Sequence, residues 1–309
     1  MSETVCLDEI DRLRRAPVVM LWLQAARLRT LSLSQAPVLA GAGLAAQQVA
    51  ISWRVVAATM AASAAIQVGT NLWNDAADAR RGIDGADRLG PPRVVALGLL
   101  DEASVRRAAM LCFAVAALLG AGLAMRGGWT ILGIGALALI AGYAYSAGPR
   151  PLSGTALGEL LVVLFFGILA VTGTMQVLGA APDGRGVAVG AVIGLPAAAI
   201  LLLNNHRDRA ADARGGRRTL AILLGPQGSR VGFAALLAAA LLGAAALSPC
   251  GPALAALVPA AALSAQVARQ VGERPVSAAL NPLLARTALA QGLLVAGMVL
   301  GPLICALAR

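Results

Sequence analysis

Long apolar stretches with very few charges are the feature that most limits what this chain can fold into. A helix needs about 20 mostly apolar residues to cross a bilayer. Stretches of about that length lie near residues 31–50, 53–79, 103–125, 128–147, 154–178, 186–206, 228–248, 252–270 and 284–307. Only 13% of the 309 residues are charged, whereas a soluble domain carries about 25%, so the chain has too few polar residues to cover a soluble fold. We therefore predict an all-α integral membrane protein with about nine transmembrane helices, in which residues 31–309 form one domain and residues 1–30 form a cytoplasmic N-terminal segment.

The charge of the chain predicts its orientation in the membrane. The net charge is +10, and all 25 basic residues are arginine. On a soluble chain this excess would suggest nucleic acid, but in a membrane protein basic residues gather in cytoplasmic loops. If the N-terminus is cytoplasmic, only four arginines fall on the far side: Arg54, Arg126, Arg185 and Arg309. We therefore expect a protein of the inner (plasma) membrane, with its N-terminus and polar loops in the cytoplasm and no nucleic-acid partner.

The tryptophans and cysteines add two smaller expectations. Trp53 and Trp129 fall at the outer ends of predicted helices, where interfacial anchors are common. The four cysteines show no metal-binding spacing. We interpret Cys112 and Cys305 as helix-packing residues, because free cysteine is among the most buried residue types.

Two groups of Asn and Asp residues stand at the cytoplasmic ends of two predicted helices, and each of these helices is followed by a predicted long polar loop, near residues 80–102 and 207–227. The first runs along Asn71, Asp75 and Asp78, at spacing i, i+4, i+7; the second runs along Asn204, Asp208 and Asp212, at i, i+4, i+8. Each spacing places its side chains on one face of a helix. The sequence around Asp78 also resembles that around Asp212, either as a trace of an internal repeat or by chance in an alanine-rich chain. An ionised carboxylate near the membrane core costs about 2.5–3.5 kcal/mol, so something must offset that cost.

Facing carboxylates and nearby arginines together predict a magnesium–diphosphate site at the inner mouth of the bundle. Carboxylates that face one another repel unless a cation lies between them, and hard oxygen ligands suit Mg²⁺, which bridges to phosphates. Arginine forks suit phosphate oxygens; the candidates are Arg80, Arg81, Arg88, Arg93, Arg207, Arg214, Arg217 and Arg218. The alternative is a set of helix-end charges solvated at the interface.

The two groups match sequence motifs of a known family. Asn74, Asp75, Asp78 and Asp84 resemble the first aspartate motif of the UbiA superfamily of membrane prenyltransferases; Asp208 and Asp212, preceded by Asn204-Asn205-His206-Arg207, resemble its second. The resemblance runs from about Trp22 to the last helix. Further segments resemble the 1,4-dihydroxy-2-naphthoate branch: Trp22-Leu23, Arg27–Leu31, Gly82-Ile83-Asp84, Asp87–Pro91, Tyr145–Pro149, Leu157-Gly158-Glu159, Phe165-Phe166-Gly167 and Gly216–Leu220. The sequence departs from the family at Leu28, usually Pro, at Arg29 and Arg217, usually Lys, and at His206, usually apolar.

The resemblance implies an activity and roles for individual residues. Mg²⁺ held by Asp75, Asp78, Asp208 and Asp212 would bind a polyprenyl diphosphate, and the polyprenyl group would pass to 1,4-dihydroxy-2-naphthoate with loss of CO₂, giving demethylmenaquinol for menaquinone synthesis. Glu159 and Tyr145 would complete the catalytic group. The substrate-binding residues would be Arg27, Asn71, Asn74, Asp84, Arg88, Asn204, Asn205, Arg207 and Arg217. The rivals are a related enzyme with another acceptor, such as 4-hydroxybenzoate, an ion-coupled secondary transporter, and a lipid-diphosphate phosphatase.

Some roles stay open at this level. Glu159 either orients the acceptor and transfers a proton or pairs with an arginine such as Arg150. His206 is either a tolerated neighbour of the second motif or a base, and Tyr143 is interpreted as a packing residue. The sequence does not determine the acceptor, the isoprenoid chain length, the oligomeric state, or which aspartate binds which ion.

Overall fold

The computed structural model describes residues 10–82, 89–148 and 151–307, and all regular structure within these ranges is helical. Seven helical segments of this described part are long and apolar enough to cross a membrane: α4 (Trp53–Arg80), α5 (Glu102–Ala144), α6 to α7 (Gly158–Val177), α8 (Gly184–Arg214), α9 (Leu220–Ala246), α10 to α11 (Gly251–Glu273) and η4 to α12 (Ala278–Leu307). An eighth, α3 (Leu31–Ala45), is apolar but shorter. The short α2 (Val18–Ala26) precedes it. The predicted all-α membrane fold is confirmed.

Helix α5 is a hairpin of two helices rather than one long rod. Gly128 breaks it with φ 71° and ψ −165°, a conformation that only glycine adopts without strain. A Cβ on Gly142 would lie 3.5 Å from Cε1 of Phe113, although a straight helix would hold these residues about 44 Å apart. The two halves therefore pack side by side, and the described segments add up to the predicted number of about nine membrane helices.

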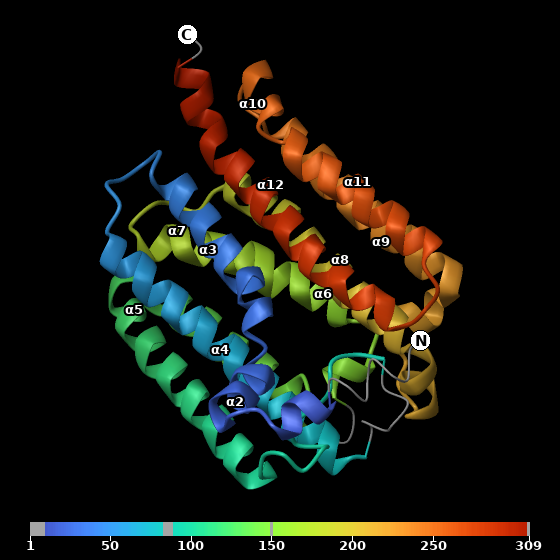
Figure 1. Cartoon of the computed structure of the whole chain (residues 1–309). Coiled ribbons are helices and arrows are strands. Elements are labelled where there is room, and N and C mark those ends of the chain that lie inside the picture. Colours follow the sequence, from blue (N-terminus) through green and yellow to red (C-terminus); the bar gives the residue numbers. More distant parts are fainter. Residues whose placement is uncertain (1–9, 83–88, 149–150, 308–309) are drawn as a thin grey trace.

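Helix α8 is the central element of the bundle. It packs against α3, α6, α7, α9 and α12, and 72% of its most apolar window is buried, compared with 22% for α5. Helices α3 to α5 form one side of the bundle, and α9, α11 and α12 form the other (Figure 1). Large apolar side chains remain exposed around the outside, as a lipid-facing surface requires.

A π-helix and three glycines bring α6 and α7 close to α8. The π-helix η3 (Leu164–Ile168) interrupts the segment between α6 (Gly158–Val163) and α7 (Leu169–Val177). Gly167, Gly190 and Gly194 lie at the contact, where a Cβ on Gly194 would approach Cα of Val163 to 2.8 Å. Only a glycine fits this approach without a shift of the backbone.

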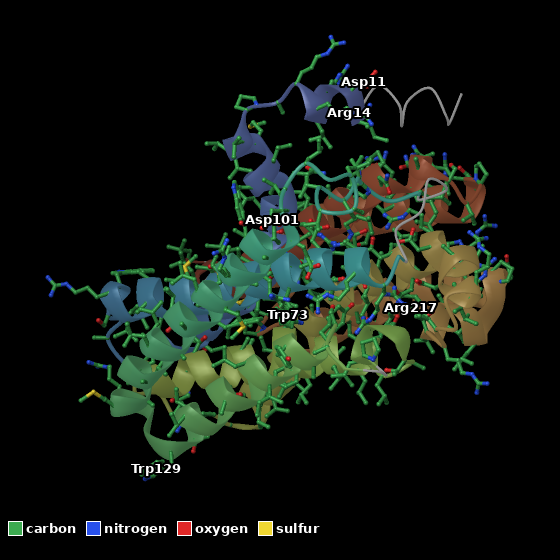
Figure 2. The ribbon with its side chains drawn as sticks, turned by 90° about the horizontal axis from the view of Figure 1, so that it is seen from below. Asp11, Arg14, Trp73, Asp101, Trp129 and Arg217 are labelled. Carbon is green, nitrogen blue, oxygen red and sulfur yellow. A yellow bond between two sulfur atoms is a disulfide. The ribbon has the colours of Figure 1, made fainter. Side chains whose placement is uncertain are left out.

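The two ends of the bundle differ in character. Trp53 and Trp129 lie at one end with 71% and 86% of their surface exposed, in the position expected of interfacial anchors. Arg217 lies toward the other end (Figure 2). Helix α12 (Asn281–Leu307) begins at the Arg217 end and carries Cys305 to the opposite end, about 36 Å along its axis.

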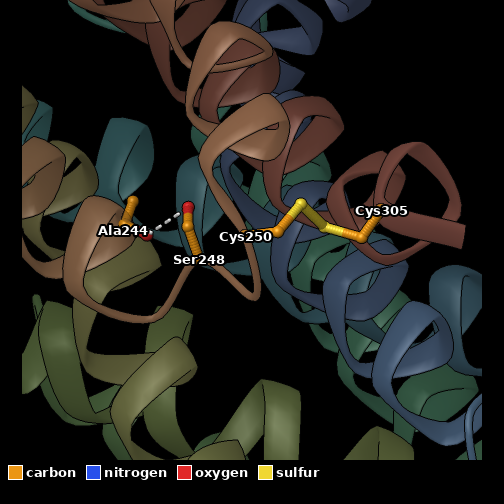
Figure 3. Close-up of a disulfide and its surroundings, with 4 residues drawn as sticks. All are labelled: Ala244, Ser248, Cys250 and Cys305. Atoms are coloured by element: carbon orange, nitrogen blue, oxygen red, sulfur yellow. Dashed lines mark hydrogen bonds between the residues drawn. A yellow bond between two sulfur atoms is a disulfide. The ribbon is translucent and has the colours of Figure 1, made fainter. Parts of the chain in front are cut away.

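A disulfide joins Cys250, before α10 (Gly251–Ala255), to Cys305 in α12, with the Cα atoms 6.0 Å apart (Figure 3). The interpretation of Cys305 as a packing residue is therefore wrong, because spacing in the sequence gave no sign that helix ends 55 residues apart would meet. Cys112 is a half-buried free thiol, consistent with packing.

The second polar loop is shorter than the sequence suggested. Residues 207–227 were expected to form a long loop, but α8 continues to Arg214 and α9 begins at Leu220. The second aspartate group therefore lies entirely on helix. Alanine and arginine are strong helix formers, which extends α8 beyond its apolar part.

Candidate active site

The end of α4 carries the first aspartate group. Asp75 and Asp78 are almost fully buried, with 1% and 3% of their surface exposed. Asn71 donates through Nδ2 to the carbonyl of Ala26 at 2.9 Å, and so fixes the end of α2 against α4. Asn71, Asp75 and Asp78 lie on one face of α4, as predicted. Asn71, however, binds a backbone carbonyl of α2.

Arg93 lies against the first group. It follows α4 in sequence, in the segment that leads to α5, and is itself buried. Its Nη1 is 3.5 Å from Oδ1 of Asp75, and its Nη2 is 3.3 Å from Oδ2 of Asp78 and 3.4 Å from Oδ1 of Asn74. One guanidinium thus neutralises part of the charge of two buried carboxylates.

The end of α8 carries the second group. Arg207 donates from Nε and Nη2 to the two oxygens of Asp208, at 2.9 and 2.6 Å. Its Nη1 donates to Oδ1 of Asn281 at 2.7 Å. Two residues earlier on α8, Nδ2 of Asn205 donates to Oε1 of Glu159 at 3.0 Å. Both α8 side chains are therefore held by residues from other elements.

Arg217 joins the two groups. Its Nη2 donates to Oδ1 of Asp78 at 3.0 Å, and its Nη1 donates to Oδ1 of Asp212 at 2.9 Å. Gly216, with φ 73°, lets the chain turn sharply after α8, so that Arg217 folds back onto the helix end. Burial alone would lower the pKa of Arg217, but the carboxylates of Asp78 and Asp212 raise it above its usual value. The guanidinium is therefore a permanent cation between the two motifs.

Two adjacent pockets lie at this end of the bundle. The polar pocket has a volume of about 250 Å³ and is lined by all of the following charged residues: Arg27, Asp78, Arg93, Arg207, Asp208, Asp212, Arg214 and Arg217. The apolar cavity has a volume of about 460 Å³ and runs between α3, α4, α5, α6, α7 and α8; Phe165 and Phe166 of the π-helix line it.

The two pockets share a border, which we call the neck. Arg27, Asn74, Tyr145, Leu201 and Asn204 line both of them. Arg27 has a left-handed backbone, with φ 53° and ψ 52°, and such strain in a non-glycine residue is typical of functional sites. Burial raises the pKa of Tyr145 to about 12, so its phenol is protonated at physiological pH and can donate a hydrogen bond.

The carboxylates at the site have the chemistry that Mg²⁺ prefers. Their oxygens are hard donors. Asp78, Asp208 and Asp212 line one pocket, whereas Asp75 lies against Arg93, outside the lining. Asp78 and Asp212 also contact the same guanidinium, that of Arg217. In the described part of the chain, however, no cluster of three or more Asp, Glu, His or Cys side chains is arranged to hold a metal ion. The aspartates face arginines instead, so the metal assignment stays a prediction supported by its donor set.

The structure brings most of the predicted residues together and separates a few. Asn204 and Asn205 line the polar pocket with the second group, and Asn71 lines the apolar cavity. Glu159 is buried but is not among the residues that line either pocket; it reaches the site through Asn205. Asp84, Arg88 and Arg150 lie outside the described residues.

Not every predicted phosphate fork lines the polar pocket. Arg80 pairs with Glu102, Arg81 donates to the carbonyl of Gly148, and Arg218 is exposed beside its neighbour Arg217. None of these three arginines lines the polar pocket. His206 is buried and packs close to Arg209, outside both linings. Tyr143 stacks on Trp73, with ring centroids 4.8 Å apart, which confirms its packing role.

Sequence reasoning missed Asn281 and Leu89. Asn281 binds Arg207 and also donates to the carbonyl of Leu89 at 3.0 Å. Leu89 lines the polar pocket. Asn281 has no charge and lies in no motif that could have marked it. Leu89 lies within the Asp87–Pro91 segment, but its contact uses the backbone carbonyl and joins segments far apart in the chain, which no sequence pattern reveals.

Fold and site together define a membrane-embedded helical protein with an arginine-rich pocket beside an apolar cavity, an arrangement that suits a molecule with an anionic head and an apolar tail. The model of the UbiA prenyltransferase family matches residues 35–288. The chain belongs to the UbiA prenyltransferase family.

Curated relatives and solved structures agree with this membership. The 1,4-dihydroxy-2-naphthoate octaprenyltransferase of Mycobacterium tuberculosis is 37% identical over 71% of this chain and 75% of the relative. The enzyme of the same name from Escherichia coli is 31% identical over 72% and 74%.

Among structures, a UbiA homologue from Archaeoglobus fulgidus bound to DMAPP and Mg²⁺ has a TM-score of 0.66 at 16% identity, covering 92% of this chain and 99% of that one. An apo UbiA homologue from Aeropyrum pernix has a TM-score of 0.62 at 17% identity, with 90% and 97% covered. At these identities the two structures support the fold alone.

Proposed function

We propose that this chain transfers a polyprenyl group from a polyprenyl diphosphate to 1,4-dihydroxy-2-naphthoate, with loss of CO₂, and so makes demethylmenaquinol for menaquinone synthesis. One observation carries the proposal: an arginine-rich pocket adjoins, at the neck, an apolar cavity of about 460 Å³. A polyprenyl diphosphate has an anionic head and an apolar tail in the same order. The naphthoate acceptor is supported by the names of relatives that are 31–37% identical.

The polar pocket would hold the diphosphate. Arg93 and Arg217 lie at its wall and would donate to phosphate oxygens as forks. The metal ligands would be Asp75, Asp78, Asp208 and Asp212; Mg²⁺ bound there would supply positive charge to the leaving diphosphate. Positive charge fixed in a pocket away from bulk water stabilises the charge that develops on the leaving group.

The reaction would take place at the neck. The allylic C–O bond breaks, and its electron pair leaves with the diphosphate. The ring carbon that carries the carboxylate attacks the allylic cation, a C–C bond forms, and the electron pair of the C–carboxylate bond returns to the ring as CO₂ departs. Tyr145 would donate a hydrogen bond at this point, Arg27 would hold an anionic substrate group, and the apolar cavity would exclude water from the cation.

Glu159 would act through Asn205 rather than directly. It accepts a hydrogen bond from Asn205, which lines the polar pocket. We therefore assign Glu159 as a residue that positions Asn205. This replaces a direct role in proton transfer, for which Glu159 would have to reach the pocket.

We further propose that the site faces the cytoplasm of the inner (plasma) membrane. The arginine distribution supports this orientation. The Cys250–Cys305 disulfide supports it independently, because disulfides persist in oxidising compartments outside the cytoplasm, and this one lies at the end of α12 farthest from Asn281 and the polar pocket.

The proposal is tested with membranes that contain the protein, Mg²⁺, a labelled polyprenyl diphosphate and a panel of aromatic acids. We expect Mg²⁺-dependent prenylation of 1,4-dihydroxy-2-naphthoate with release of CO₂, and none in membranes without the protein. Transfer to 4-hydroxybenzoate instead would show that the chain is a prenyltransferase of this family with a different acceptor. Release of phosphate without transfer to any acceptor would contradict the proposal.

A further inference from the structure

Asn281 occupies a position where three separate parts of the site meet. It is the first residue of α12 and follows the 3-10 helix η4 (Ala278–Leu280). It is half-buried and stands behind the polar pocket, outside the set of residues that line it. Its two amide atoms bind two different segments, one from the α8 end and one from the chain that follows α4.

The amide oxygen holds Arg207. Nη1 of Arg207 donates to Oδ1 of Asn281 at 2.7 Å, while the remaining face of the guanidinium forks onto Asp208. Adjacent residues on a helix do not face one another, so the side chains of Arg207 and Asp208 meet only if Arg207 is bent back. Its contact with Asn281 fixes the guanidinium, which is 3% exposed, in that orientation. The direction of the Asp208 carboxylate therefore depends on Asn281.

The amide nitrogen holds the other wall of the pocket. Nδ2 of Asn281 donates to the carbonyl of Leu89 at 3.0 Å. Leu89 lines the polar pocket, and four residues later Arg93 contacts Asp75 and Asp78. The same side chain thus ties the segment that clamps the first aspartate group to the arginine that orients the second.

We propose that Asn281 is a positioning residue for the diphosphate end of the site, acting through Arg207 on Asp208 and through Leu89 on the Arg93 segment. A side-chain amide suits this place because it offers one acceptor and one donor side by side. A carboxylate would keep the contact with Arg207 and lose the one with Leu89, and an apolar residue would lose both. The ligand in this inference, a diphosphate, rests on the function proposed above.

The test measures the binding of inorganic pyrophosphate in the presence of Mg²⁺ to the purified full-length protein, together with kcat and KM for transfer. We expect Asn281→Ala to weaken pyrophosphate binding roughly tenfold or more, as expected from the loss of hydrogen bonds to a charged group. The KM for the aromatic acceptor should stay within about twofold. Asn281→Asp, which keeps the shape and the acceptor for Arg207, should lose less than Asn281→Ala.

A matched control separates positioning from stability. Gln291 is a buried amide on the same helix, and its Nε2 donates to the carbonyl of Ile193 at 2.9 Å, about 15 Å along α12 from Asn281. Gln291→Leu should lower the melting temperature and leave pyrophosphate affinity unchanged. In a double-mutant cycle, Asn281→Ala should have a smaller effect in the Arg207→Ala background than in the wild type, because only the contact with Leu89 is left to lose and residues that act through one another are not additive.

The outcomes distinguish this inference from the proposed function. Wild-type protein that binds no pyrophosphate and transfers no prenyl group would overturn both. Wild-type protein that does both, with Asn281→Ala unchanged in affinity, would overturn the role of Asn281 alone. Equal losses in Asn281→Ala and Gln291→Leu, equal losses in the Ala and Asp variants, or full additivity with Arg207→Ala would also overturn it.

Discussion

The two aspartate groups look alike in sequence but are held in different ways. Asp75 and Asp78 on α4 have only 2% and 5% of their side chains exposed, and the arginines against them come from elsewhere: Arg93 from the segment before α5, and Arg217 from beyond α8. Asp208 has 23% of its side chain exposed and is forked by the arginine next to it. The arginines that contact the second group therefore come from its own stretch of chain, whereas those that contact the first come from other segments.

The difference explains why the groups are not interchangeable copies. A buried carboxylate without a partner is strongly unfavourable, so the first group can be buried only together with Arg93 and Arg217, which contact it. The second group has its arginines close by in the chain, but Asn281 of α12 still has to hold Arg207 in the orientation that meets Asp208. One arginine, Arg217, contacts both and makes the pocket a single unit.

The largest expected effect comes from removing one carboxylate of either group. Asp75→Ala and Asp208→Ala should each lower transfer about 10³-fold or more, because each removes a proposed metal ligand and with it stabilisation of the leaving diphosphate. The measurement is the rate of prenyl transfer in membranes, with the amount of inserted protein as the control. A wild-type rate in either variant would contradict the prediction that transfer requires carboxylates from both aspartate groups.

Replacing Arg217, which contacts both aspartate groups, should have a smaller effect than removing a carboxylate, and mainly on the KM for the donor. Arg217→Ala should raise the KM for the polyprenyl diphosphate roughly 10- to 100-fold, as expected for a lost hydrogen bond between charged groups. The KM for the acceptor should change far less. The matched control is Arg218→Ala, because Arg218 is adjacent, exposed and outside the pocket lining. A donor KM unchanged by Arg217→Ala would count against the bridge.

The smallest effect on catalysis is expected from the disulfide, which touches neither group. Replacing Cys250 and Cys305 together by Ser should leave the transfer rate unchanged. It should lower the free energy of unfolding by about 2–4 kcal/mol, because the bridge closes a long loop of chain. Thermal unfolding with and without reductant measures this. A loss of activity at full stability would show that the far end of the bundle is coupled to the site.

The spacing of polar residues predicted part of the site correctly. Asn204, Asp208 and Asp212 line one pocket, as their helical spacing indicates, because periodicity within one helix is a local property. The same reasoning listed several arginines as equal candidates for phosphate binding. It could not separate Arg217, which reaches two carboxylates, from Arg218, which is exposed, because that choice depends on the turn at Gly216.

Sequence patterns could not predict the contacts between distant segments. Neither Asn281 nor the Cys250–Cys305 bridge follows from spacing or composition, since each depends on which ends of α12 lie beside α8 and α10. The role of Glu159 changed for the same reason: its partner, Asn205, lies 46 residues away.

The sequence alone determined that this chain is a membrane bundle, and its motifs identified the family, because the apolar length that a bilayer demands and the residues of each helix face are written in consecutive positions. Only the tertiary structure decided how carboxylates and arginines pair, that the polar pocket lies beside an apolar cavity, and that Glu159 and Asn281 stand behind the site. These features depend on the distances between side chains of helices that come together only on folding. Polar contacts between such side chains are stronger, and unpaired polar groups more costly, when they are buried.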